Sequence, residues 1–168
     1  DLEDIENKKL NLLGKEYSIV TADHQGTYNI KLTLMGGAIE DTMEEYTTKT
    51  YTIKDKEYKV KVIAIATESS TIKAKFQVND EVTDPLQKGE TYTLEDGSEI
   101  GVRDLLENEG TEEGGADVVT FFLGAQKVIL TDTSTNVTNG GGTIQVGSNT
   151  LDNVYLDIIS NSDAGTAA

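Results

Sequence analysis

The chain has 168 residues, of which 30 are acidic and 14 basic, and its formal net charge is −16. Such a charge repels nucleic-acid phosphates and anionic lipid head groups, and no local basic patch stands out, so we expect no nucleic-acid partner. Cysteine is absent, which excludes disulfides, thiolate metal sites and thiol catalysis. No apolar run approaches the ~18–20 residues that a membrane-spanning helix needs, so we expect no membrane span in this chain.

Residues 1–8 are mostly acidic, and we expect a flexible N-terminal segment there. Apolar and polar residues then alternate over 28–34, 58–64 and 72–78. Because side chains alternate across a β-strand, each segment predicts a strand with one buried and one solvent-facing side. Further short strands are expected at 17–20, 50–53, 91–94, 118–123 and 127–130.

Two segments lack this simple alternation. Residues 118–123 are apolar on both faces, which predicts a central strand, and Gly124 after them can adopt a positive φ and close a hairpin. Residues 100–110 place Val102, Leu105 and Leu106 at helical spacing and end at Gly110. This spacing predicts a short helix near 103–109. Residues 36–46 fit a turn of helix or a loop.

A short pattern occurs twice, as "TYTIKDKE" at 50–57 and "TYTLEDGSE" at 91–99. In each copy alternating apolar residues lead into a turn, and alternation resumes after it. Asp96-Gly97 is a strong hairpin signal. Only the second copy has glycine, and the acids do not recur at ligand spacing. The pattern therefore predicts two strand–turn–strand units rather than two metal loops.

The amino-acid composition changes after residue 132. Residues 133–142 are rich in Thr, Asn and Gly and predict a linker or long loop. Residues 143–168 predict a small β hairpin with a flexible C-terminus, either the start of a second domain or an assembly arm. Pairing within the chain is favoured for this hairpin over exchange between subunits. For 9–132 we predict an all-β domain, an antiparallel β-sandwich or partly open barrel with one short helix.

Catalytic signals are weak. The single histidine, His24, lies beside Asp23 and next to a glycine, where an exposed loop histidine is favoured over a catalytic base. A pair of carboxylates of the glycosidase kind stays open because acids are so numerous, but tryptophan is absent and aromatic residues are few. The "NGGGT" segment at 139–143 fits no phosphate-binding loop. We expect no enzyme.

Acidic clusters and one sequon are the candidate sites. Calcium prefers six to eight oxygen ligands, and none of the clusters has EF-hand spacing, so solvated loops are the competing interpretation. We expect divalent cations, calcium first, to bridge neighbouring subunits weakly. Asn136-Val137-Thr138 is a glycosylation sequon in a polar loop. The candidate cation ligands are Glu40, Asp41, Glu44 and Glu45; Asn79, Asp80, Glu81 and Asp84; and Glu107, Glu109, Glu112 and Glu113.

Five blocks follow one another along the chain: "LGKEYSIVTAD", "KLTLMGGAIEDTMEE", "TKTYTIKDKEYKVKV", "FQVNDEVTDPLQKGETYTLEDGSEIGVRDLL" and "ADVVTFFLGAQKVILTDT". Their order resembles domains of archaeal surface-layer (S-layer) proteins. The resemblance covers residues 9–133 and implies a β-rich, acidic, often N-glycosylated subunit of a lattice outside the cell membrane, many of which need divalent cations. We therefore expect an extracellular, non-catalytic structural protein that self-associates into a lattice or related filament.

The alternative is a carbohydrate-binding or adhesive β-sandwich module with a surface glycan as its partner. Such a module needs exposed aromatic side chains on one face or in clustered loops. Tyr46 and Tyr155 are the tyrosines whose positions suit that role.

Overall fold

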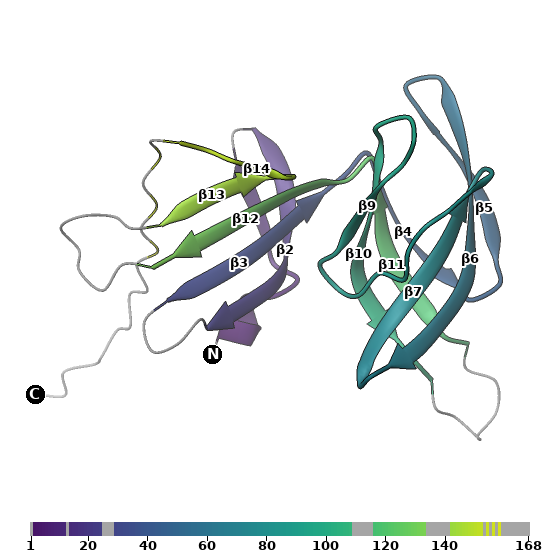
Figure 1. Cartoon of the computed structure of the whole chain (residues 1–168), viewed down its shortest axis with the longest axis horizontal. Coiled ribbons are helices and arrows are strands. Elements are labelled where there is room, and N and C mark those ends of the chain that lie inside the picture. Colours follow the sequence, from purple (N-terminus) through teal and green to yellow (C-terminus); the bar gives the residue numbers. More distant parts are fainter. Residues whose placement is uncertain are drawn as a thin grey trace, which may run out of the picture.

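The computed structural model describes residues 2–12, 14–24, 29–108, 116–133 and 142–152, together with residues 154, 156 and 158. Over these residues the chain is all-β, with antiparallel strands in three sheets, none of them closed into a barrel (Figure 1). Sheet A has the order β1 (Lys9–Leu12), β2 (Lys15–His24), β3 (Ile30–Gly36), β12 (Gln126–Asp132), β13 (Thr143–Val146) and β14 (Asn149–Thr150).

Sheets B and C pack face to face as a β-sandwich. Sheet B has the order β4 (Ile39–Glu44), β11 (Val118–Leu123), β10 (Glu99–Leu106) and β9 (Thr91–Thr93). Sheet C has the order β5 (Thr48–Ile53), β6 (Lys56–Glu68), β7 (Thr71–Val78) and β8 (Glu81–Val82). The shared core includes Phe76 of sheet C, whose ring centroid lies 5.4 Å from that of Phe121 in sheet B.

The sandwich is inserted into sheet A. The chain passes from β3 into β4 through Gly37 and Ala38, and it returns from β11 into β12 through Gly124 and Ala125. β3 pairs with β12 in sheet A, and β4 pairs with β11 in sheet B. One antiparallel ribbon therefore runs through both units and joins them (Figure 1).

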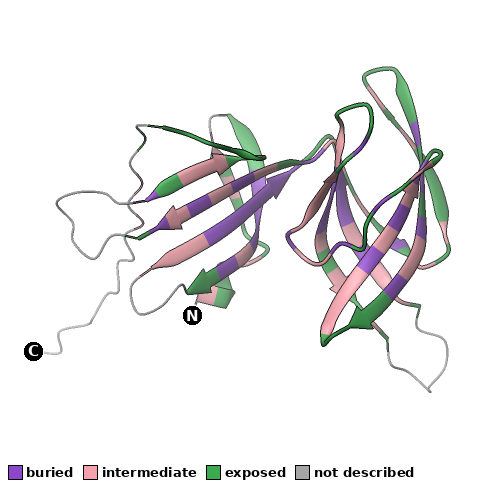
Figure 2. Cartoon of the chain, viewed as in Figure 1, coloured by how far each residue is buried: buried purple, intermediate pink, exposed green. Residues whose placement is uncertain are grey.

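Each unit has its own buried cluster, and a third cluster lies where the units meet. The buried residues form stripes along the strands of both units (Figure 2). The junction cluster consists of Val20, Met35, Phe122 and Ala125. Gly101 allows close approach there, since a Cβ on it would lie 2.5 Å from the Met35 sulfur. Sheet A therefore covers one end of the outer side of sheet B.

The predicted helix near 103–109 is wrong, because residues up to Leu106 belong to strand β10. The register of β10 against β11 shifts between Val102 and Asp104. This bulge adds one residue, so Val102 and Leu105 both pack toward the core although they are three positions apart. A bulged strand thus mimics helical spacing. Residues 36–46, for which a turn of helix or a loop was expected, contain strand β4.

Two further expectations change at the junction and at the N-terminus. Gly124 has a positive φ of 66°, as expected, but it closes no hairpin. β11 and β12 instead continue along the ribbon, each paired with a different strand. Residues 2–5, expected to be flexible, form the 3₁₀ helix η1 (Leu2–Ile5), whose Leu2 and Ile5 pack against the sheet A core.

Other predictions are confirmed. β11 lies at the centre of sheet B, between β4 and β10. The repeated pattern forms two strand–turn–strand units, β5 with β6 and β9 with β10. In the segment after residue 142, β13 pairs with β12; the preference for pairing within the chain over exchange between subunits stays a prediction.

Candidate functional site

The two copies of the repeated pattern meet at one end of the sandwich. Asp96, in the β9–β10 turn, forms an ion pair with Lys56 at the start of β6. The Tyr58 hydroxyl donates to Asp96 Oδ2 at 2.8 Å, and the Ser98 amide donates to Oδ1 at 2.8 Å. The bond from Lys56 is the largest cause that holds the pKa of Asp96 well below its usual range, against the opposing effect of burial. Asp96 therefore ties the two sheets together.

The predicted cation ligands on β4 have protein partners or point apart. Glu40 forms an ion pair with Arg103, whereas Asp41, next to it, points to the other side of the strand and binds Lys49. Glu44 is exposed, and Glu45 accepts the Ile65 amide at 3.0 Å. These carboxylates do not converge on one point.

The second predicted cluster lies around the β7–β8 turn. Asn79 Oδ1 accepts the Lys59 amide at 2.9 Å, and Glu81 Oε2 accepts the Glu95 amide at 2.9 Å. Asp80 and Asp84 are exposed. In the described part of the chain, no three His, Asp or Glu side chains gather as metal ligands. Calcium bridging stays a prediction, tested by comparing assembly size with and without chelator at fixed ionic strength.

The remaining predicted site residues are dispersed. Glu107 binds the Thr67 hydroxyl, while Glu109, Glu112 and Glu113 lie outside the described residues. Asp23 and His24 are consecutive, exposed residues at the end of β2. Tyr46 is 71% exposed at the β4–β5 turn. Asn136 and Tyr155 also lie outside the described residues, so glycosylation of Asn136 stays a prediction for mass spectrometry.

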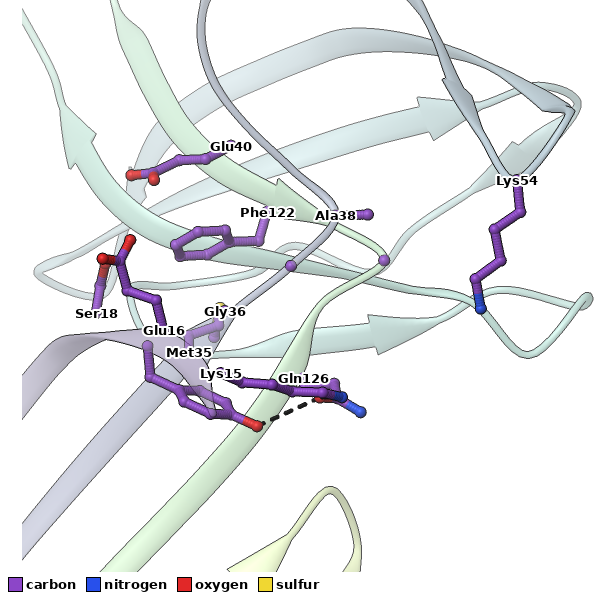
Figure 3. A pocket seen from close by; sticks show the side chains of 13 residues that line it. Lys15, Glu16, Ser18, Met35, Gly36, Ala38, Glu40, Lys54, Phe122 and Gln126 are labelled. Atoms are coloured by element: carbon purple, nitrogen blue, oxygen red, sulfur yellow. Dashed lines mark hydrogen bonds between the residues drawn. The ribbon is translucent and has the colours of Figure 1, made fainter. Parts of the chain in front are cut away.

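A groove lies at the junction of the two units (Figure 3). It encloses about 570 Å³ between β2 and the two connections that join sheet A to sheet B. Lys15 and Tyr17 both donate to Gln126 Oε1, at 2.9 and 3.3 Å. Glu16 binds Lys9 at 2.6 Å. The charged side chains are of both signs and several have partners, so the groove points to no particular ligand chemistry.

The outer edge of β4 is blocked by side chains. The Glu45 amide donates to the Asp117 carbonyl at 2.8 Å, so the backbone groups of Glu45 face the neighbouring strand β11. Inward-facing and outward-facing residues alternate along a strand, so the backbone groups of Glu44 and Thr42 face outward. Asp41 Oδ1 accepts the Thr42 amide at 2.7 Å, and Lys49 Nζ donates to the Thr42 carbonyl at 3.3 Å. The outward Glu44 carbonyl accepts the Thr47 hydroxyl at 2.6 Å. A further strand has few backbone groups to pair with here.

Asp41 makes most of the side-chain bonds that block the β4 edge. Besides the Thr42 amide it accepts Lys49 Nζ at 2.8 Å and the Tyr51 hydroxyl at 2.7 Å, both from β5. Burial alone would raise the pKa of Asp41, but these bonds together hold it below its ordinary value. The carboxylate thereby closes the side of the sandwich between β4 and β5.

The outer edge of β5 is open. The two-residue turn Lys54-Asp55 has positive φ at both positions, 48° and 65°, which is typical of a tight hairpin. Thr50 is paired with Lys59 of β6. The Lys59 amide donates to Asn79 Oδ1 and the Lys59 carbonyl accepts the Asn79 amide, so both groups face away from β5. Paired residues of this kind point away from each other, so the Thr50 amide and carbonyl face outward. Among the described residues no group bonds to them.

Backbone groups that face outward recur at every second residue of β5, so the amides and carbonyls of Thr48 and Thr52 also face outward. The three threonines form a row on the outer side of sheet C, whereas Tyr51 and Ile53 pack against the core. β5 is the last strand of its sheet and is largely exposed along its length (Figure 2). We call this row of threonines, with its outward backbone groups, the β5 edge.

Comparisons with known protein families, with curated proteins and with solved structures found no match. Over the described residues no helix is long and apolar enough to cross a membrane.

Sequence reasoning missed the difference between the β4 and β5 edges. The signal was present, because Thr48, Thr50 and Thr52 alternate with Lys49, Tyr51 and Ile53. What was missing was the position of β5 at the end of a sheet, which depends on pairing between distant segments.

Proposed function

We propose that this chain is a non-catalytic structural subunit of an extracellular cell-surface assembly, an S-layer lattice or a related filament. One observation carries the proposal: the β5 edge is open, while the neighbouring β4 edge is blocked by side chains of its own chain. Exposed strand edges lead to association unless they are covered, shortened or blocked. A chain that blocks one edge and leaves the next one open has a surface suited to strand addition.

The β5 edge fits a second copy of itself. An antiparallel pair centred on Thr50 sets Thr50 opposite the same residue of the other copy, and Thr48 opposite Thr52. The backbone groups of all three residues face outward, so in this register each threonine can form hydrogen bonds with the threonine opposite it. Each cross-strand threonine pair adds roughly 0.2–1 kcal/mol beyond the backbone bonds. The resemblance to S-layer domains and the acidic composition support the same kind of assembly.

A proline at position 50 tests the proposal. Thr50→Pro removes the outward amide but no bond to β6, so the fold is retained, as circular dichroism will verify. In about 1 M salt, where charges are screened within ~3 Å, sedimentation should show dimers of the wild type and monomers of the variant. Thr50→Val keeps the amide and should dimerise like the wild type. Dimers of Thr50→Pro at wild-type concentration would contradict the proposal.

The carbohydrate-binding alternative has one supporting observation, the exposed ring of Tyr46. A sugar-binding surface stacks its ligand on such rings. A glycan array separates the two functions: retention of a glycan by monomers, lost in Tyr46→Ala, would favour the alternative.

A further inference from the structure

The charges of the sandwich are unevenly distributed. Residues 48–78, from β5 to the end of β7, contain seven of the 14 basic residues and only three of the 30 acidic ones. Their formal charge is therefore +4 within a chain of −16. The expectation that the chain has no local basic patch is wrong.

Strand alternation gathers these lysines on the outer side of sheet C. On β6, Val60 and Val62 are buried, so Lys59 and Lys61 point to the opposite side and are exposed. On β7 the buried Ala74 and Phe76 alternate in the same way with two lysines. We call this surface the lysine face: Lys59, Lys61, Lys73 and Lys75.

The lysine face is largely free of internal ion pairs. Lys73 binds Glu68 at 3.1 Å. Among the described residues the other three lysines have no acidic group within 4.0 Å. Glu57 and Asp80, both exposed, line the same hollow as Lys59 and Lys61 but form no ion pair with them. Positive charge is therefore available here to an acidic partner.

The outer side of sheet B carries the opposite charge. Its end away from sheet A exposes Glu44 of β4 and Asp104 of β10. Between them, the Thr42 and Thr120 hydroxyls lie 2.8 Å apart, which confirms that β4 and β11 present these side chains on one side. Over the described residues neither acid has an ion-pair partner. We call Thr42, Glu44, Asp104 and Thr120 the acidic face.

We propose that the lysine face of one copy docks on the acidic face of the next copy. The two faces lie on opposite sides of the sandwich, so each copy offers both, and the contact is head-to-tail. Such a contact does not close on itself and extends into a row of subunits. This inference rests on the proposed function and adds a direction of growth to it, because the two-fold β5 contact alone closes into dimers. The head-to-tail contact joins such dimers into a row.

A second copy fits the lysine face better than a long polyanion. The net charge of −16 repels a polyanion and a second copy alike at long range. A second copy can present its acidic face to the lysines and keep its other acids at a distance, whereas a polyanion is negative along its whole length. Salt would weaken the contact, because its charges lie on exposed surfaces.

Charge reversal in a Thr50→Pro background tests the face contact alone, since that background removes the β5 edge. At low ionic strength the Thr50→Pro protein should associate in a concentration-dependent manner. Lys59→Glu/Lys61→Glu should weaken association at least ~10-fold, and so should Glu44→Lys/Asp104→Lys. Lys8→Glu/Lys31→Glu lowers the net charge as much as Lys59→Glu/Lys61→Glu does, away from both faces, and should change association much less.

Mixing the two reversed variants gives the decisive result. Glutamates at positions 59 and 61 of one variant then face lysines at positions 44 and 104 of the other, while its unchanged acidic face docks on the unchanged lysine face of the other variant. An equimolar mixture should therefore restore association in alternating order. A mixture that stays dispersed would overturn the proposal, as would single reversals that associate normally. If heparin binds the Thr50→Pro protein through Lys59 and Lys61 while the protein does not self-associate, the face docks a polyanion and the proposal fails. None of these results depends on the β5 edge.

Discussion

Asp96 shows how one residue joins distant parts of this chain. Its carboxylate accepts bonds from Tyr58 on β6 and from the Ser98 amide within its own turn, and it forms an ion pair with Lys56. These partners come from both copies of the repeated pattern, which the sequence presents 40 residues apart. The repeat is therefore a structural joint between sheets B and C.

Replacing Asp96 by asparagine should lower the free energy of unfolding by about 1–2 kcal/mol at pH 7, because charged bonds on a partly exposed group are lost. A carboxylate whose pKa is lowered by folding stabilises the protein above its unfolded pKa, and this contribution disappears as the pH falls. The difference between wild type and Asp96→Asn should thus stay constant from pH 7 to about 5 and shrink below about 4.

Urea unfolding across this pH range measures the effect. Asp55→Asn, in the facing turn, is the control and should cost little at any pH, because Asp55 is exposed. A loss for Asp96→Asn that is the same at pH 3 as at pH 7 would contradict the role of its charge.

The strands illustrate how much of the elements the sequence predicts. Alternation of polar and apolar residues located most strands, because burial on one side of a sheet imposes a period of two. It failed at β10, where a bulge after Val102 shifts the period by one residue. The positive φ of Gly124 was predicted, but the hairpin was not formed, because β11 and β12 on either side of Gly124 pair with β4 and β3. The local sequence does not reveal which distant strand each of them joins.

The β4 edge gives a prediction at the same scale. Asp41→Ala removes the acceptor of the Thr42 amide and the partner of Lys49 and Tyr51. The free energy of unfolding should fall by about 1–2 kcal/mol, since the partly buried Tyr51 hydroxyl and two exposed donors lose their acceptor. The freed edge should also associate. In a Thr50→Pro background and about 1 M salt, where charges are screened, light scattering should show aggregates.

Glu44→Ala is the matched control for Asp41→Ala. It lies on the same strand and its side chain is exposed, so its removal leaves Thr42 blocked. Equal light scattering from the two variants would show that Asp41 does not protect the edge.

The molecule as a whole is a sandwich inserted into a second sheet, an arrangement that the sequence did not predict. It had suggested one domain over 9–132 and a separate hairpin, whereas β13 extends sheet A and the sandwich is the interrupting part. Local patterns do not determine such long-range pairing, because strands of similar composition can pair in many orders. The candidate surfaces depend on this pairing and were missed for the same reason.

Close packing at the junction should hold the two units in one orientation. Gly101→Ala places a methyl group 2.5 Å from the Met35 sulfur, and overpacking of this kind costs about 1–3 kcal/mol. Thermal unfolding should show the loss. Met35→Val removes the overlapping atom, so the double variant should lose less than the sum of the two single variants. Full additivity would mean that Met35 is not the obstacle.

Electron microscopy of the purified chain at low ionic strength tests the central claim, self-assembly, most directly. The wild type should form ordered arrays or fibres as its concentration rises. A variant that combines Thr50→Pro with Lys59→Glu/Lys61→Glu should stay dispersed. Wild-type particles of single-chain size at every concentration, with monomers in sedimentation, would contradict the account.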